Sequence, residues 1–390
     1  MTSLSKNIVT VFQDLLKAPA SLHEPCFVGN EWAYVKDCID TGWVSTAGSY
    51  VGRFEEMLQD FTNAKHVIAT SSGTAALHAV FAGLEIGAGD EVIIPALTFV
   101  ATANAVTYTG ATPHFADVET TSLGLDASKL RAYLEVTTEQ RDGQLINIKT
   151  GRRITAIACM HTFGHASDLD ALTALCDDYG IDLIEDAAES LGSYYKGHHT
   201  GNHGRVSTLS FNGNKTVTTG GGGAIMTNDD ALAQKLRHIT TTAKQAHKWE
   251  FIHDEIGYNY RLPNMNAALG CAQLEALPSF LKQKRQLAEA YASAFADIEG
   301  VNFFTEPAWG QSNYWLNLLM LDAADSMLRD QVLEATNDAK FMTRAAWRPM
   351  HQLKMFMDCP RMDLSVTEDV YARLINIPSS PQLAAHLPNG

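Results

Sequence analysis

Short apolar runs alternate with amphipathic stretches of helical spacing between residues 67 and 227. The runs with β-strand character cover residues 67–70, 91–94, 112–115, 154–160, 182–185, 206–210 and 224–227. Strands that alternate with helices form βαβ units, and such units assemble into a largely parallel sheet. The pattern therefore predicts an α/β fold with a mostly parallel central sheet.

The segments on either side follow other patterns. Residues 4–16 have helical spacing and predict a loosely attached arm, and residues 31–40 predict a second helix that stops at Thr41-Gly42. After residue 266 a long helical pattern begins, and strand-like runs follow at 314–321 and 374–377. We therefore expect an N-terminal helical arm (1–45), a large domain (46–265) and a small C-terminal α/β domain with a bridging helix (266–390).

Two local features interrupt these patterns. Pro278 lies within the long helical stretch and should kink or interrupt it, because proline cannot donate a backbone hydrogen bond. The polar stretch 137–153 contains Asp142-Gly143, which predicts an inserted surface hairpin without a chemical role.

Composition narrows the class of protein. With 390 residues, 46% of them hydrophobic, the chain can bury a large core in two domains. The formal net charge of −15 argues against a general nucleic-acid binder or a binder of anionic membranes. The six scattered cysteines form no disulfide-like framework, and neither a signal peptide nor a membrane-length apolar run is visible. We expect a cytoplasmic enzyme.

Three stretches suggest one chemistry. Lys215 follows a strand-like run and precedes four glycines, Asp186 ends another buried run, and a helical pattern opens at Gly73 after a third. Open α/β sheets bind ligands at the carboxyl ends of their strands, where these residues would meet. A helix start that holds a phosphate, an acid that pairs with a pyridinium nitrogen and a lysine that forms a Schiff base suit pyridoxal 5′-phosphate.

Other interpretations fit less well. A lysine in such a loop is most often a solvated surface charge, and only the acid and the helix start argue otherwise. A dinucleotide-dependent oxidoreductase would need its glycines to open a helix, whereas Gly220–Gly223 lie between two strand-like runs. His198, His199 and His203 lie in a glycine-rich turn without cysteines, so we expect no metal site there.

The motifs together resemble the DegT/DnrJ/StrS family of sugar aminotransferases, from about Pro25 to the carboxyl end. They are GWVS at 42–45, SGTAAL at 72–77, PALTF at 95–99, EDAA at 185–188, SFNGNK at 210–215 and GYNYR at 257–261. The resemblance implies a fold-type I pyridoxal-phosphate-dependent transferase, similar to aspartate aminotransferase. A lysine at position 215 favours transamination, because dehydratases of the family carry histidine there.

The resemblance also implies roles for single residues. Lys215 and Asp186 would be catalytic, and the cofactor contacts would come from Gly73, Thr74, Ala75, Phe99, Asp186, Ala188, Glu189, Ser210, Lys215 and Asn259. Glu189 departs from the glutamine or histidine of several family branches, which leaves its role open. Candidates for substrate contacts are Trp43, Ser45, His161, Trp347 and His351.

The implied reaction transfers an amino group from L-glutamate to a keto sugar on a nucleoside diphosphate. Within the family the chain most resembles the 4-aminotransferases of legionaminic acid or bacillosamine pathways, which act on UDP-4-keto-6-deoxy-N-acetylglucosamine. A GDP-linked 4-keto-6-deoxymannose, a 3-keto sugar and a catalytically silent cofactor-binding protein are the alternatives. If Asn259 reaches the cofactor phosphate of a neighbouring subunit, the active unit is a homodimer with shared active sites.

Overall fold

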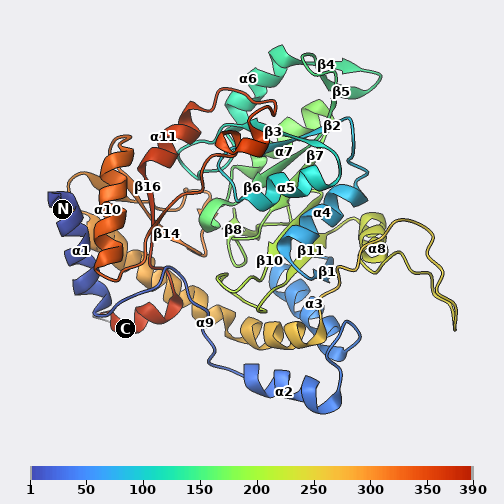
Figure 1. Ribbon diagram of the computed structural model, residues 1–390, viewed down its shortest axis with the longest axis horizontal. Helices are drawn as coiled ribbons and strands as arrows, with labels where there is room; N and C mark the ends of the chain where they lie inside the picture. Colours follow the sequence, from blue (N-terminus) through green and yellow to red (C-terminus); the bar gives the residue numbers. More distant parts are fainter. Residues whose placement is uncertain (1, 388–390) are drawn as a thin grey trace.

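A nine-stranded sheet forms the centre of the large domain in the computed structural model, which describes residues 2–387 (Figure 1). Seven of its strands follow the order β1-β11-β10-β7-β6-β2-β3. Their bounds are β1 His66–Thr70, β2 Asp90–Pro95, β3 Thr112–Ala116, β6 Arg153–Met160, β7 Asp182–Asp186, β10 Val206–Ser210 and β11 Gly223–Thr227. The pairs from β10 to β3 are parallel, which confirms the predicted α/β class.

β11 is the exception within this order, because it pairs antiparallel with both β1 and β10. Residues 211–222, which carry Lys215, connect β10 to β11 without a helix. The segment returns directly into the neighbouring strand, so β10 and β11 form an antiparallel pair, whereas parallel strands are usually connected through a helix. The lysine therefore lies on the loop between two neighbouring strands.

Helices cover both faces of the sheet. On one face α4 (Gly73–Gly83), α5 (Val100–Tyr108) and α8 (Asp230–Ile239) share a buried apolar cluster with the strands. The helices α3 (Ser49–Thr62), α6 (Ala127–Thr137), α7 (Leu169–Tyr179) and the start of α9 contribute to the clusters on the other face. Both faces are thus buried, which explains why the parallel strands are nearly continuous apolar runs.

The small domain is an antiparallel sheet with helices beside it. Its strand order is β12-β14-β16-β15. The bounds are β12 Val301–Phe303, β14 Asn317–Leu321, β15 Arg344–Ala345, β16 Leu374–Ile377, α10 Ser326–Asp338 and α11 Ser365–Arg373. This domain contains both strands that the sequence predicted after residue 300.

The long helix α9 (Asn264–Phe295) joins the two domains. It runs through Pro278, so the predicted interruption does not occur. The neighbouring Leu277 and Phe280 are buried, and their packing outweighs the one backbone hydrogen bond that proline removes. Among residues 2–387, no helix is both long and apolar enough to cross a membrane.

Smaller elements complete the fold. The predicted hairpin is confirmed as β4 (Thr138–Arg141) and β5 (Gln144–Asn147), which turn at Asp142-Gly143. A third sheet joins β8 (Tyr194–Tyr195), β9 (His198–His199) and β13 (Gly310–Gln311). The 3-10 helices are η1 Thr162–Gly164, η2 Met350–Gln352, η3 Lys354–Phe356 and η4 Pro381–His386.

The N-terminal helix α1 (Ser3–Leu16) is not a loose arm, which corrects the expectation from sequence. Ile8, Phe12 and Leu16 are fully buried within the core of the small domain, and Figure 1 shows α1 beside α10. The second helix, α2 (Glu31–Thr41), packs instead against α9. Residues 2–45 therefore do not form one unit. Residues 1 and 388–390, which belong to the expected N-terminal and C-terminal ranges, lie outside the described residues.

Phe12→Ala should lower the free energy of unfolding by about 3–5 kcal/mol, because it removes a fully buried ring from this core. Denaturant unfolding of the purified variant measures the loss. Gln13→Ala, on the exposed side of the same helix, is the control and should change it by less than about 0.5 kcal/mol. Equal stability of the two variants would mean that α1 is loosely attached after all.

Candidate active site

A cavity of about 490 Å³ lies between the carboxyl ends of the sheet strands and the small domain. Asp186, Glu189 and Lys215 line it from the large domain, and Arg344 and Asn376 line it from the small domain. Its size suits a cofactor together with a small substrate. The three stretches that the sequence singled out thus meet in one place.

The start of α4 forms one wall of this cavity. Ser72 caps the helix by accepting a hydrogen bond from the Ala75 N–H at 3.0 Å, while Gly73 and Thr74 line the cavity. A Cβ on Gly73 would lie 2.9 Å from Cβ of Ser210, so only glycine permits this close approach. The remaining N–H groups and the Ser210 hydroxyl suit a phosphate.

Ala75 departs from the expected set of cofactor contacts. Its backbone N–H is already bonded to Ser72 Oγ, and the residue is buried outside the cavity lining. Its contribution is therefore to the cap of the helix that presents Gly73 and Thr74.

Asp186 lines the cavity and is almost fully buried. Thr102 Oγ1 donates a hydrogen bond to Oδ2 at 2.7 Å, and the Ala188 N–H donates to Oδ1 at 3.2 Å. Burial raises the pKa of Asp186 above its ordinary value, and these bonds offset the effect only in part. A carboxylate with uncompensated charge fits a ligand that brings a protonated ring nitrogen, as pyridoxal 5′-phosphate does.

Lys215 is held by two contacts. Its Nζ lies 3.1 Å from Glu189 Oε1 and 3.7 Å from the ring centroid of Trp315. The indole N–H of Trp315 in turn donates to the Asn214 carbonyl at 2.7 Å, which fixes the ring against the lysine loop. The amine is thereby pointed into the cavity and largely shielded from water.

The contacts of Glu189 indicate its role, which the sequence left open. It is buried, and its Oε2 accepts a hydrogen bond from the Phe163 N–H at 2.8 Å while Oε1 meets Lys215. Burial raises the pKa of Glu189 to about 7, because it outweighs the attraction of Lys215. The carboxyl can therefore hold or release a proton near neutral pH, directly beside the lysine amine.

Aromatic rings bound the opening of the cavity. Phe99 is 50% exposed and lies 6.3 Å from Trp347, measured between ring centroids. Trp347 is stacked on Phe163 at 4.6 Å and lines the cavity, and its contact with a substrate stays a prediction. Phe99 and Ala188 also line the cavity, and their placement on the two faces of a cofactor ring stays a prediction.

His161 does not face the cavity, and its predicted substrate contact is wrong. The side chain is fully buried; Nε2 lies 2.9 Å from Glu185 Oε2, and Nδ1 accepts from the Ser167 N–H at 3.3 Å. Successive side chains of a strand point to opposite faces, so the pairing of His161 with Glu185 puts it on the side away from Asp186.

Glu185 is the better-anchored of the two adjacent acids. Besides His161, the N–H groups of Gly201, His203 and Gly204 donate to its carboxylate at 2.7–2.8 Å. Burial would raise the pKa of Glu185, but the hydrogen bond and charge of His161 and the Gly204 N–H lower it to about 2. This charged group stabilises the fold and stays out of the cavity.

Four further predicted residues do not line the cavity of this chain. Trp43 is 59% exposed, and Ser45 and Asn259 are exposed as well. His351 is bonded through Nε2 to Glu368 at 3.0 Å, which turns it away from the site. Their expected contacts are therefore not formed within a single copy of the chain.

Sequence reasoning missed most cavity residues of the small domain, among them Trp315, Arg344 and Asn376. Trp315 and Arg344 belong to no recognisable motif, and only the tertiary fold brings them to Lys215. Asn376 had a local signal, because it is the single polar residue in the apolar strand 374–377. An unmatched polar residue in a buried strand deserves a search for a nearby ligand site.

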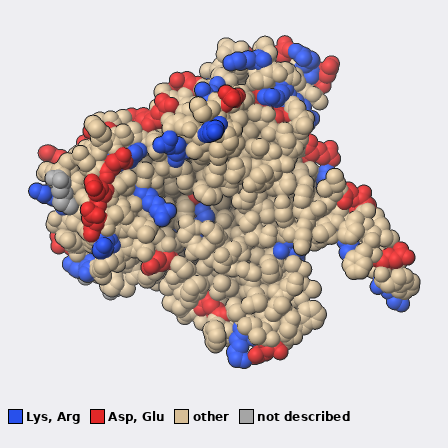
Figure 2. Space-filling view, viewed as in Figure 1, with Lys and Arg blue, Asp and Glu red and all other residues tan. Residues whose placement is uncertain are grey.

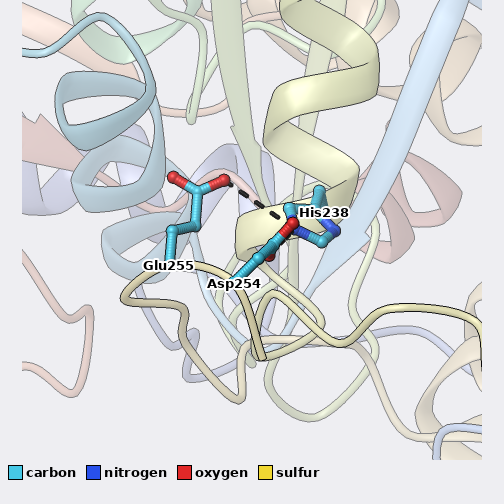
Figure 3. Close-up of side chains that lie close together, drawn as sticks. All are labelled: His238, Asp254 and Glu255. Atoms are coloured by element: carbon cyan, nitrogen blue, oxygen red, sulfur yellow. Dashed lines mark hydrogen bonds and ion pairs between the residues drawn. The ribbon is translucent and has the colours of Figure 1, made fainter. Parts of the chain in front are cut away.

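Among the described residues, one group of three side chains has potential metal-ligand atoms close together: His238, Asp254 and Glu255 (Figure 3). His238 Nε2 lies 2.6 Å from Asp254 and 3.8 Å from Glu255, and Gln245 also donates to Asp254. An ion pair that fastens the end of α8 to the following segment accounts for these contacts. The group lies outside the cavity and has no role in its chemistry.

Glu189→Gln should change how stability depends on pH in the cofactor-free protein. Folded Glu189 keeps its proton up to about pH 7, whereas the unfolded side chain loses it near its ordinary pKa of 4.5. Its stabilising contribution is therefore complete below pH 4.5 and declines by about 1 kcal/mol per pH unit toward pH 7. Glu189→Gln should lack this decline in urea unfolding between pH 5 and 7, whereas the exposed control Glu299→Gln should retain it. Parallel curves for all three proteins would contradict the raised pKa.

Comparison with known proteins agrees with this geometry. The chain is 36% identical over 363 residues to a GDP-perosamine synthase of Vibrio cholerae, covering 93% of this chain and 94% of the relative. It is 34% identical to a GDP-perosamine synthase of Escherichia coli O157:H7, with the same coverage. The crystal structure of a DegT DnrJ EryC1 StrS aminotransferase from Brucella abortus matches with a TM-score of 0.81 at 27% identity, covering 92% of this chain and 94% of that one. The profile of the DegT/DnrJ/EryC1/StrS aminotransferase family matches residues 25–386, and the chain belongs to this family.

Proposed function

We propose that this protein transfers an amino group from L-glutamate to a keto sugar carried by a nucleoside diphosphate. The observation that carries the proposal is the position of Lys215 Nζ, held between Glu189 and Trp315 in the cavity that Asp186 also lines. A silent binding protein would not need a shielded amine beside a titratable acid. Lys215 and Asp186 are both present, which argues for turnover.

The cofactor of this sugar aminotransferase is pyridoxal 5′-phosphate. When bound, it supplies a carbonyl group for the donor's amine and a ring that accepts the electrons left on the substrate carbon. Gly73, Thr74 and Ser210 would hold its phosphate, and Asp186 would pair with the ring nitrogen. Phe99 and Ala188 would hold the two faces of the ring.

The proton steps fall to Lys215 and Glu189. Lys215 removes the proton from the donor's α carbon and delivers a proton to the sugar carbon in the second half of the reaction. The neutral amine is needed for this role, and Glu189 can accept the proton that an ammonium form gives up. Trp315 covers the amine and limits access of water.

The names of the relatives favour a GDP-linked acceptor. Two chains at 34% and 36% identity are GDP-perosamine synthases, so GDP-4-keto-6-deoxymannose is the first acceptor to test. UDP-4-keto-6-deoxy-N-acetylglucosamine, which the overall likeness of the sequence favoured, is the second, and a 3-keto sugar is the third. The amination of each is the same chemistry at the same lysine. We expect the enzyme to act in the cytoplasm, where nucleotide sugars are made.

An absorbance spectrum of the holoenzyme, recorded before and after addition of glutamate, tests the first half-reaction. Glutamate should convert the visible band of the lysine-bound cofactor into the shorter-wavelength band of its amine form, and a keto-sugar nucleotide should reverse the change. Lys215→Ala should reduce turnover at least about a thousandfold, because it removes both the covalent attachment and the proton carrier. A holoenzyme whose spectrum ignores glutamate would refute the donor, and a fully active Lys215→Ala would refute the mechanism.

We also propose that the active unit is a homodimer with shared sites. Trp249, Phe251 and Ile256 are 71–84% exposed on residues 241–257, which extend from the body of the molecule in Figure 1. Charged side chains lie mainly around the outline of the face in Figure 2, and most atoms near its middle belong to uncharged residues. A second copy would cover these three exposed apolar side chains. Trp43, Ser45 and Asn259 would then complete the neighbouring cavity.

Mixing two defective variants tests the shared site. Lys215→Ala lacks the lysine, and Asn259→Ala should weaken the cavity of its neighbour, so each alone should have low activity. In a mixed dimer one cavity receives Lys215 from one chain and Asn259 from the other, and activity should return after subunit exchange. Lys215→Ala mixed with the double variant Lys215→Ala/Asn259→Ala is the control and should stay inactive. No gain in the first mixture, despite confirmed exchange, would exclude sharing through Asn259.

A further inference from the structure

One charged side chain in the cavity has no partner. Four ionisable groups line it, and three of them are engaged: Asp186 with Thr102, and Glu189 with Lys215. The fourth, Arg344, makes no ion pair and no side-chain hydrogen bond with any of residues 2–387, and it is exposed at the cavity wall. A guanidinium is always charged and offers five donors in a fixed fork.

The small sheet places Arg344 beside a second unsatisfied group. Arg344 in β15 is paired with Asn376 in β16, and residues directly opposite each other in a sheet project on the same face. Asn376 is only 3% exposed; its Nδ2 donates to the carbonyls of Arg344 and Ala345 at 3.4 and 3.3 Å. Its Oδ1 is buried, and none of the described residues forms a hydrogen bond with it.

We propose that Arg344 binds the α-carboxylate of the amino donor, with Asn376 as a positioning residue that accepts a hydrogen bond from the guanidinium. This inference rests on the proposed function and adds the group that selects the donor. Arginine pairs with a carboxylate through two parallel hydrogen bonds, which fix direction as well as charge. The exposed guanidinium then supplies the donors that the buried Asn376 Oδ1 lacks.

The chemistry of the two substrates makes the donor the better partner. An amino acid carries its carboxylate on the carbon that reacts, so that group must enter the cavity with the amine. The keto carbon of a sugar nucleotide is bordered by ring carbons and hydroxyl groups, and its diphosphate lies on the far side of the ring. The cavity of about 490 Å³ has room for the reacting end of a substrate beside the cofactor. The diphosphate should therefore lie farther from the reacting carbon than the donor's carboxylate does.

The half-reaction with glutamate and the half-reaction with the sugar nucleotide can be measured separately, which shows which of the two substrates Arg344 binds. With Arg344→Gln holoenzyme, stopped-flow absorbance should show the glutamate concentration for half-maximal rate raised about tenfold to a hundredfold, the loss expected for a charge-assisted hydrogen-bonded pair. The reverse change, from the amine form with the keto-sugar nucleotide, should keep its rate and concentration dependence. Arg344→Lys should lie between, because it keeps the charge and loses the fork. Arg348→Gln, exposed four residues away and outside the cavity lining, should behave as wild type.

A binding measurement supplies a readout without turnover. Calorimetric titration of wild-type holoenzyme with succinate, a dicarboxylate that carries no amine, should show binding that Arg344→Gln weakens by a similar factor. Asn376→Ala should weaken it less, with no change in the sugar half-reaction. Because Arg344 is exposed, we expect its variants to keep the melting temperature of the wild type.

Three outcomes would overturn the assignment: unchanged glutamate dependence in Arg344→Gln, an equal loss in both half-reactions, or a loss confined to the sugar half-reaction, which would assign Arg344 to the nucleotide sugar. A wild-type holoenzyme that ignores glutamate would instead refute the proposed function. The two failures are therefore distinguishable.

Discussion

The buried carboxylate of Glu185 is the contact on which the active site depends. It brings together the end of β7, His161 after β6 and the N–H groups of residues 201–204, which precede β10. A charge in this position would be very costly without these four hydrogen bonds, so each segment must be in place before the group is satisfied. Glu185 thus fixes the strands on one face of the sheet, while Asp186, the next residue, is presented to the cavity on the other.

That division explains why two adjacent acids have opposite properties. The Glu185 carboxylate is surrounded by donors, which hold its pKa far below the ordinary value, whereas Asp186 has few donors and a raised pKa. A group that is satisfied within the protein holds the fold together, and one that is left short of partners is available to a ligand. The same distinction separates the engaged His161 from the unsatisfied Asn376.

The sequence predicts the parts of this architecture that are encoded locally. The period and length of the apolar runs are enough to predict the sheet. The small residues that follow the strand ends are enough to predict that Gly73, Asp186 and Lys215 lie at its carboxyl edge. The orientation of His161 depends on which face of a strand becomes the floor of the cavity, and the attachment of α1 depends on apolar partners nearly 300 residues away, such as Tyr291. Neither can be derived from a single segment. Trp315 and Arg344 likewise acquire their meaning only when the small domain is folded against the large one.

The cavity must accept two unlike substrates in turn, and its charges are arranged for this. Lys215 Nζ lies 3.1 Å from Glu189 Oε1, and burial raises the pKa of this carboxyl to about 7. A proton that passes from the ammonium of Lys215 to the Glu189 carboxylate leaves both groups neutral, so the amine can be freed without an unpaired buried charge. Arg344 lines the cavity from the small domain, apart from this pair, and under our proposal it recognises the carboxylate that only the amino donor carries. In this proposal the chemistry common to both substrates belongs to the large domain, whereas discrimination between them belongs to the small domain. The long helix α9 packs in the cores of both domains and so holds them at a fixed separation. The spacing between Lys215 in the large domain and Arg344 in the small domain is therefore determined by the fold.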